Sequence, residues 1–180
     1  MVEWAQSLIA VDDNDNFIRY APRKECHTGK GVRHRGITLL IFNKDKKILL
    51  QKRKHDVFDN IWDLAGATHP VHNKDSDETY EQSGVRCMEA EWGVKTELKN
   101  ILAYTYFEKY GSLCENELCA LLAGQFDGQL KPNGEHMYDH RWVTWKQILD
   151  ELSKEPENFT PWLKVAIEKL KGHEFLDKIS

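Results

Sequence analysis

The chain has 180 residues with 25 Lys and Arg against 29 Asp and Glu, so its formal net charge is −4. A chain of this length buries about 70% of its unfolded surface in one domain, so folding requires neither disulfides nor a structural metal. A weakly acidic balance also lacks the basic surplus that binds nucleic acids or anionic membranes. We expect a single domain over residues 1–180, with its core at about 4–170, that binds no nucleic acid and no membrane.

Cysteine usage and the first residues bear on the compartment. Cys26, Cys87, Cys114 and Cys119 include no Cys-x-x-Cys pair, which argues against a zinc ribbon or a disulfide scaffold and favours a reducing compartment. Residues 1–4 lack the basic start and apolar stretch of a signal peptide, and no apolar run approaches the length of a membrane span. We expect a cytoplasmic protein, and the sequence leaves its oligomeric state open.

Two hairpins are predicted in the first third of the chain. Residues 7–11 and 17–20 are strand-like and flank a polar turn at 12–16. Residues 37–42 form an almost continuous apolar run that is followed by a polar turn and a second strand at 48–53. The first strand of this second hairpin is therefore expected to be buried on both faces.

A helix is predicted over residues 77–93. Asp77 suits the N-cap, Glu78 would lie in the first turn, and Gly93 stands at the stop position. The apolar residues that recur at helical spacing should face the core: Val85, Met88 and Trp92.

The second half of the chain predicts more strands and two short helices. Strands are expected at 101–107, 115–126 and 142–145. A helix at 146–152 follows, and Thr160-Pro161 opens a final helix with proline in its first turn. Clustered strands with a few intervening helices indicate an α+β fold or an α/β/α sandwich.

Histidine and glutamate side chains are candidates for a metal site. Glu115 and Glu117 alternate along a predicted strand and therefore share one face. With His27, His34 and His69 they would form a mixed nitrogen and oxygen site for Mg²⁺, Mn²⁺ or Zn²⁺. Taken singly, each histidine has a commoner role, solvated or packed in the core. We assign that role to the remaining histidines: His55, His72, His136, His140 and His173.

The predicted helix carries the most specific pattern. Residues 72–94 resemble a degenerate Nudix box, G-x5-E-x7-R-E-U-x-E-E-x-G-U, where U is a bulky apolar residue. The matching residues are Glu78, Arg86, Met88, Glu91, Gly93 and Val94. His72 replaces the first glycine, Cys87 the glutamate after the arginine, and Ala90 the first paired glutamate. Nudix hydrolases hold several Mg²⁺ ions with the glutamates of this box. Because this chain has fewer of them, the sequence predicts ordinary pyrophosphohydrolysis less strongly.

The flanking segments resemble type 1 isopentenyl-diphosphate isomerases, a family within the Nudix superfamily. The similar segments are 27–34, 62–70, Glu115-Asn116-Glu117 and Thr160-Pro161-Trp162. The likeness covers about residues 7–170, and the motifs are specific when taken together. It implies an α/β fold, a Nudix-type α/β/α sandwich with a mixed sheet and an added N-terminal β-hairpin. It also implies a small-molecule diphosphate as substrate.

The resemblance implies ligands for two metal ions. One divalent ion, Mg²⁺ or alternatively Mn²⁺ or Zn²⁺, would be held by His27, His34, His69, Glu115 and Glu117. Glu91 would help to hold a second Mg²⁺ that arrives with the substrate diphosphate. Arg23, Arg53 and Lys54 would face the phosphates, and a solvated basic rim is an equally weighted alternative.

The resemblance also implies groups for proton transfer and cation binding. The indole of Trp162 would lie against a developing carbocation, with plain core packing as its alternative. Glu117 would transfer a proton, and either Tyr104 or Tyr106 would be the active-site tyrosine. The family's second proton-transfer group is a cysteine two residues before the His-Pro pair, where this chain has Ala67.

Three functions stay open from the sequence. The first is an isomerase with an altered acid/base pair. The second is a Nudix hydrolase that cleaves a diphosphate or phosphate ester with water as nucleophile, favoured by Glu78 and Glu91. The third is a catalytically silent diphosphate-binding module. Thr68 is a far poorer acid or base than a thiol, and Cys26, next to His27, is the remaining thiol to check.

Overall fold

The computed structural model describes residues 6–180, so the predictions made for residues 1–5 lie outside the described residues. Nine strands in this range form one sheet. Strand β10 (Leu113–Gln125) runs parallel to β3 (His34–Phe42), whereas the other pairings in the sheet are antiparallel. The predicted mixed sheet is therefore confirmed.

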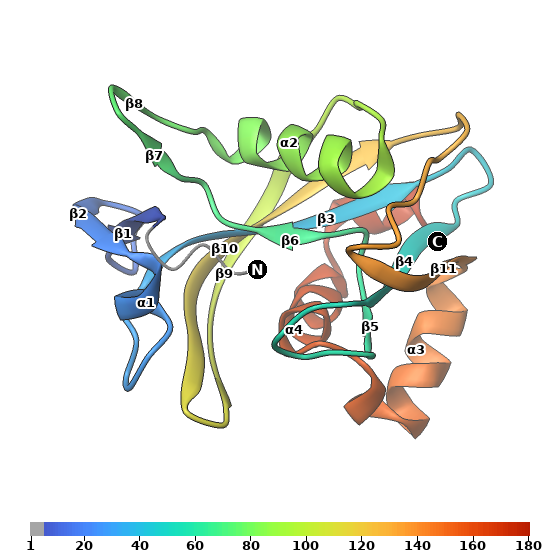
Figure 1. Cartoon of the computed structure of the whole chain (residues 1–180). Helices are drawn as coiled ribbons and strands as arrows, with labels where there is room; N and C mark the ends of the chain where they lie inside the picture. Colours follow the sequence, from blue (N-terminus) through green and yellow to red (C-terminus); the bar gives the residue numbers. More distant parts are fainter. Residues whose placement is uncertain (1–5) are drawn as a thin grey trace.

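Strand β3 lies at the centre of this sheet and pairs with four other strands, β1 (Ser7–Val11), β4 (Ile48–Arg53), β6 (Ala67–Thr68) and β10 (Figure 1). The remaining strands of the sheet are β2 (Phe17–Pro22), β5 (Trp62–Asp63), β9 (Lys99–Tyr110) and β11 (Met137–Val143). The predicted N-terminal hairpin is formed by β1 and β2 and extends one end of the sheet. A separate small hairpin pairs β7 (His72–Asn73) with β8 (Ser76–Asp77).

Helices cover both faces of the sheet. Helix α2 (Tyr80–Trp92) lies on one face, and α3 (Trp145–Lys154) and α4 (Pro161–Leu170) lie on the other (Figure 1). The shorter helical segments are α1 (Arg23–Cys26), η1 (Pro156–Asn158) and η2 (Glu174–Lys178). This arrangement confirms the α/β/α sandwich.

The two faces of β3 explain why its sequence is apolar almost throughout. Leu39 and Ile41 pack in the core beneath α2, whereas Leu40 packs in the core beneath α4. All three side chains are fully buried. Burial on both faces, as predicted, makes β3 a rigid base for the residues at its start.

The N-cap predicted for the helix that became α2 is wrong by two residues. The N-cap of α2 is Thr79, whose hydroxyl accepts from the Gln82 amide while the Gln82 side chain accepts from the Thr79 amide. This capping box satisfies two helix-end donors together and is stronger than the single cap predicted at Asp77. Asp77 lies in β8, and Glu78 precedes the helix. The predicted stop is confirmed, because Gly93 has φ +64° in the left-handed region.

Of two further predicted boundaries, one is wrong and one is confirmed. The strand predicted at 142–145 ends at Val143, because Thr144 forms another capping box and Trp145 is already helical. The final helix is confirmed, with Thr160 as N-cap and Pro161 in its first turn. Packing continues past residue 170, since Phe175 and Ile179 are buried.

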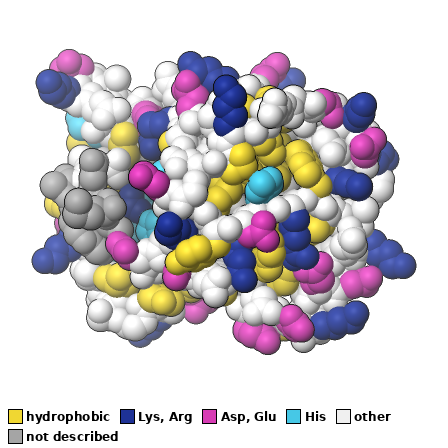
Figure 2. Space-filling view, turned by 45° about the vertical axis from the view of Figure 1, so that its right-hand side comes forward, with side chains coloured by type: hydrophobic (Ala, Val, Ile, Leu, Met, Phe, Trp, Pro, Cys, Tyr) yellow, Lys and Arg dark blue, Asp and Glu magenta, His cyan; other side chains and the backbone are white. Residues whose placement is uncertain are grey.

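The surface carries both signs of charge. On the face shown in Figure 2, lysine and arginine side chains alternate with acidic ones, and apolar side chains lie between them. Among residues 6–180, no helix is both long and apolar enough to cross a membrane.

Candidate metal centre and its crevice

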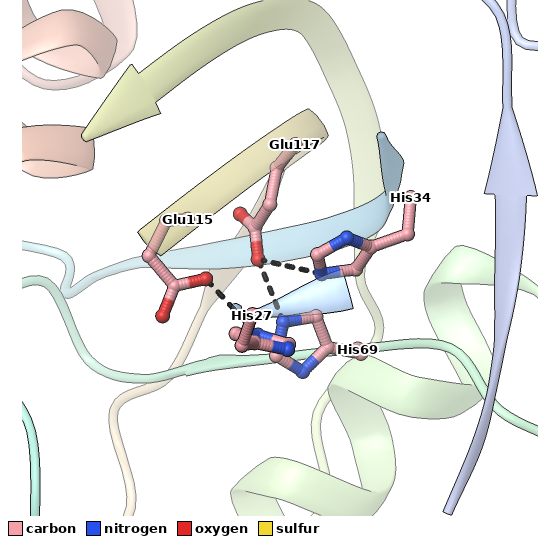
Figure 3. A group of neighbouring side chains, drawn as sticks. All are labelled: His27, His34, His69, Glu115 and Glu117. Atoms are coloured by element: carbon pink, nitrogen blue, oxygen red, sulfur yellow. Dashed lines mark hydrogen bonds and ion pairs between the residues drawn. The ribbon is translucent and has the colours of Figure 1, made fainter. Parts of the chain in front are cut away.

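Five buried side chains converge at one end of the sheet (Figure 3). They come from the end of α1, the start of β3, the loop after β6, and β10, and are His27, His34, His69, Glu115 and Glu117. Their ligand atoms all lie within 4.8 Å of one another. The sequence prediction of one mixed nitrogen and oxygen cluster therefore holds in space.

Backbone carbonyls fix the orientation of two of the imidazoles. The Nδ1 atom of His27 lies 2.8 Å from the Arg23 carbonyl, and that of His34 lies 2.8 Å from the Val32 carbonyl. Because a carbonyl only accepts, each Nδ1 carries the proton and each Nε2 keeps a free lone pair. Burial lowers the pKa of His34 to about 3, which keeps this ring in the neutral form that metals bind.

The carboxylates face these imidazole nitrogens. His27 Nε2 lies 3.1 Å from Glu115, and His34 Nε2 and His69 Nε2 lie 3.7 Å and 2.7 Å from Glu117 Oε1. Burial alone lowers the pKa of His27, but the Glu115 carboxylate raises it above its ordinary value. Burial also lowers the pKa of His69.

Four of the buried cluster atoms have no hydrogen-bond partner among the described residues: Nε2 of His27, Nε2 of His34, Nδ1 of His69 and Oε2 of Glu115. Buried polar atoms are almost always satisfied. Imidazole nitrogens and carboxylate oxygens that point at one another without partners are suited to a divalent cation between them. The residues present therefore fit a divalent metal ion.

Glu117 is positioned from two sides. The Tyr106 hydroxyl donates to Glu117 Oε2 at 2.7 Å, and burial together with the Glu117 charge raises the pKa of Tyr106, so the phenol remains a donor. On the other side, a Cβ atom at Gly36 of β3 would collide with the Glu117 carboxylate. The Glu117 carboxylate therefore occupies the space that a side chain at position 36 would fill.

The structure separates the two candidate tyrosines. Tyr104 shares the β9 face of Tyr106, but its hydroxyl contacts Thr38 at 3.4 Å and donates to the Trp162 carbonyl at 3.2 Å. Tyr104 is 4% exposed and supports the site from behind. Tyr106 is the tyrosine whose hydroxyl contacts a carboxylate of the five-residue cluster.

A crevice runs from the cluster of three histidines and two glutamates, called here the histidine–glutamate cluster, to a pocket lined by arginine side chains. A cavity of about 40 Å³ is lined by Glu115, Glu117, Tyr106, Trp162 and Ala67, among others. It adjoins a cavity of about 320 Å³. The residues that line both cavities are Arg23, Arg53, His55, Ala67 and Thr68. Ala67 therefore lies where the two cavities meet.

The larger cavity is rich in cationic side chains. Arg23, Arg53 and Arg86 line it, and guanidinium groups pair well with phosphate oxygens. Lys54 is not brought here, because its Nζ donates to the Gly134 carbonyl at 2.9 Å and lies over the ring of Tyr138. Successive side chains at the end of β4 point to opposite sides, which separates Arg53 from Lys54.

The surviving Nudix-box residues have different environments. Glu78 accepts two 2.8 Å hydrogen bonds from Arg86, and Arg86 also donates to the His69 carbonyl at 2.9 Å. Glu91 lines the larger cavity and accepts from Gln51 at 3.0 Å and from Cys87 at 3.3 Å. Burial raises the pKa of Glu91 to about 7, against the effect of these hydrogen bonds.

Sequence reasoning missed some residues of the crevice. His55 was given a background role, but it lines both cavities, and burial with the nearby Arg53 and Arg23 charges lowers its pKa to about 4. Its place two residues after Arg53 at a strand end was the available signal. Gln51 of β4 alternates with Arg53 and lines the same pocket.

No thiol occupies the place of the family's cysteine. Cys26 is fully buried with Leu8 and Ala21, away from the crevice, and Cys119 lies 3.3 Å from the Thr38 hydroxyl. Among the described residues, no cysteine lines either of the two cavities.

Solved structures with the same fold include two proteins of low sequence identity. A protein of Deinococcus radiodurans has a TM-score of 0.70 and 15% identity, covering 94% of this chain and 99% of that one. A MutT protein from Methanosarcina mazei has a TM-score of 0.61 and 17% identity, covering 78% and 94%. At these identities the likeness shows the fold alone.

Sequence relatives are closer. An isopentenyl-diphosphate delta-isomerase of Haloarcula marismortui is 34% identical over 178 residues, covering 91% of this chain and 90% of that protein. Isopentenyl-diphosphate delta-isomerase 2 of Aromatoleum aromaticum is 28% identical over 166 residues, covering 91% and 85%. The NUDIX domain family matches residues 32–163. The chain therefore belongs to the Nudix family, with isopentenyl-diphosphate isomerases among its relatives.

Proposed function

We propose that the chain is a single-domain, divalent-metal-dependent isomerase that converts isopentenyl diphosphate to dimethylallyl diphosphate by a 1,3-proton shift. The observation that carries the proposal is the buried cluster of three histidines and two glutamates beside a crevice that leads to an arginine-lined pocket. The isomerase relatives support the same reaction.

The larger cavity would hold the substrate diphosphate. Arg23 and Arg53 would pair with its oxygens, and Glu91 would help to hold a Mg²⁺ ion that accompanies it. A divalent ion held by the five-residue cluster would supply positive charge that fixes the ligand carboxylates and acidifies the groups it touches.

The smaller cavity would hold the alkene. One proton adds to the terminal alkene carbon, and positive charge develops on the branched carbon. A different proton then leaves the methylene group on the diphosphate side of the branched carbon, where the new double bond forms. Because Ala67 carries no acid or base, solvent water would supply or accept whichever of these two protons Glu117 does not. Glu117, hydrogen-bonded by Tyr106, would exchange a proton with the substrate. Trp162 lines the same cavity, where an aromatic face stabilises a cation.

A Nudix hydrolase is the second candidate, and Ala67 is the observation that favours it. A methyl group lies at the junction of the cavities, where an isomerase needs a second proton carrier. Hydrolysis uses water as its nucleophile and needs no thiol. Against it, Glu78 is fully paired with Arg86, which leaves Glu91 as the box carboxylate in the larger cavity.

One experiment separates these functions. The protein, loaded with Mg²⁺ and Mn²⁺, is incubated with isopentenyl diphosphate in D₂O, and the products are followed by NMR. Isomerisation places deuterium in dimethylallyl diphosphate, whereas hydrolysis releases inorganic phosphate. If neither product forms but the ligand raises the melting temperature, the protein is a diphosphate-binding module and both enzyme proposals fail.

A further inference from the structure

A carboxylate that the sequence analysis did not single out lies directly behind the crevice. Asp63, at the end of β5, is fully buried and lines neither cavity. Both of its oxygens contact residues that do: Trp162 Nε1 lies 2.8 Å from each oxygen, and Arg53 Nη1 lies 3.1 Å from Oδ2.

Two further donors complete the surroundings of Asp63. The Thr160 hydroxyl and the Leu64 amide donate to Oδ1 at 2.9 Å and 2.8 Å. Burial raises the pKa of Asp63, and the Arg53 charge and these donors oppose the shift. A buried carboxylate costs free energy unless it is paired and hydrogen-bonded. Asp63 is paired and hydrogen-bonded by residues of three separate segments.

Through these contacts Asp63 joins Arg53, which lines both cavities, to Trp162, which lines the smaller one. The Arg53 guanidinium carbon lies 4.9 Å from the centre of the Trp162 ring, and both side chains line the smaller cavity. Because each is bonded to one carboxylate, neither can rotate without losing a charge-assisted hydrogen bond. Asp63 therefore fixes the indole and the guanidinium relative to each other.

We propose that Asp63 is a positioning residue that sets the cation-facing indole of Trp162 and the phosphate-facing guanidinium of Arg53. It acts through them and does not touch the substrate. The inference rests on the proposed function, because the isomerase reaction assigns a carbocation to the indole and a diphosphate to the guanidinium.

The test measures two affinity ratios on the Mg²⁺-loaded protein by calorimetry. The cation ratio compares 2-(dimethylamino)ethyl diphosphate, whose protonated amine replaces a tertiary carbocation, with neutral 3-methylbutyl diphosphate. The phosphate ratio compares 3-methylbutyl diphosphate with its monophosphate. A smaller folded fraction lowers all affinities by one factor, so a general loss of stability changes neither ratio.

Three variants give different patterns. Asp63→Asn is expected to lower both ratios by about tenfold, because it removes a charged hydrogen-bond acceptor. Trp162→Phe keeps an aromatic ring without the N–H and is expected to lower only the cation ratio. Arg53→Lys keeps the charge without the planar fork and is expected to lower only the phosphate ratio.

The proposal is overturned if Asp63→Asn leaves both ratios unchanged, or if the wild-type protein does not prefer the ammonium ligand. Should Asp63→Asn fail to fold, the wild-type indole N–H signal of Trp162, assigned by its absence in Trp162→Phe, provides the test. Slow exchange with D₂O supports the anchor, and exchange as fast as free indole overturns it. If Asp63→Asn lowers both ratios as expected but the wild-type protein forms no isomerised product in D₂O, the proposed function fails and the positioning role of Asp63 stands.

Discussion

The histidine–glutamate cluster and the Nudix-box helix α2 both contribute carboxylates to the crevice, but the surroundings of these carboxylates differ. In the cluster, Glu115 Oε2 and the Nε2 atoms of His27 and His34 are buried without hydrogen-bond partners among the described residues. On the helix side, Glu78 is neutralised by Arg86, and Glu91 accepts from two uncharged donors. The first region leaves buried nitrogen and oxygen atoms free for the cation proposed above, whereas the carboxylates of the second already accept hydrogen bonds from protein groups.

This difference shows that a carboxylate's neighbours, more than its place in a motif, decide what it can bind. Cys87 and Ala90 stand where the Nudix box has glutamates, so the helix lacks the charge that several Mg²⁺ ions need. Glu78 acts through Arg86 on the His69 carbonyl. Of the surviving box residues, Glu78 and Arg86 thus support the histidine–glutamate cluster, whereas Glu91 faces the larger cavity. Four substitutions probe the crevice and the helix beside it.

The largest effect is expected from Glu117→Gln. This change replaces the carboxylate proposed to hold the metal and transfer a proton with a neutral amide, which still accepts from the Tyr106 hydroxyl, so we expect isomerisation to fall by about a hundredfold or more. The rate of deuterium incorporation and the bound metal content measure it. Glu97→Gln, at an exposed carboxylate, is the control and should leave both unchanged. A Glu117→Gln protein with wild-type turnover would contradict the assignment.

Ala67→Cys is expected to raise the isomerisation rate by about tenfold, because a thiol at the junction of the cavities supplies a second proton carrier. Ala67→Ser is the matched control, since its hydroxyl has nearly the same size but does not ionise near neutral pH. Equal rates in the two variants would show that residue 67 does not face the alkene.

Glu78→Gln is expected to weaken binding of the metal ion by about tenfold. It leaves Arg86 without its charged partner and so loosens the loop that presents His69, an effect typical of residues that orient metal ligands. Titration with Mn²⁺, followed by electron paramagnetic resonance, measures the affinity. Glu81→Gln, in the exposed first turn of α2, serves as control. Unchanged Mn²⁺ affinity together with lost phosphate release would instead favour the hydrolase.

The smallest effect is expected at the helix start. Thr79→Ala removes the N-cap hydroxyl of α2 and should lower the free energy of unfolding by about 1 kcal/mol, a fall in melting temperature of about 2–4 °C. Asp77→Ala should cost less, because Asp77 pairs with His72 near the surface and does not cap the helix. Thermal unfolding of the two variants shows which residue caps the helix. A larger fall in melting temperature for Asp77→Ala than for Thr79→Ala would support the cap that the sequence predicted.

Much of the fold followed from local pattern. The continuous apolar run of β3 predicted burial on both faces, and Gly93 marked the helix end because only a left-handed residue fits there. The start of α2 did not follow, because Asp77 and Thr79 both suit an N-cap by residue type. Only the backbone path past β8 decides which hydroxyl or carboxylate reaches a free amide.

The sequence by itself, through its resemblance to a known family, predicted the Nudix-type fold and the five candidate ligands, and it shows directly that residue 67 is alanine. Such a resemblance needs only short motifs of residue type and spacing. The tertiary structure alone decided that Tyr106 contacts Glu117 while Tyr104 lies behind, that Lys54 points away from the arginine pocket, and that Asp63 joins Trp162 to Arg53. These contacts link residues as far as 99 positions apart. Their geometry depends on how β5 and β9 pair within the sheet and on how α4 packs against it, which no local pattern encodes.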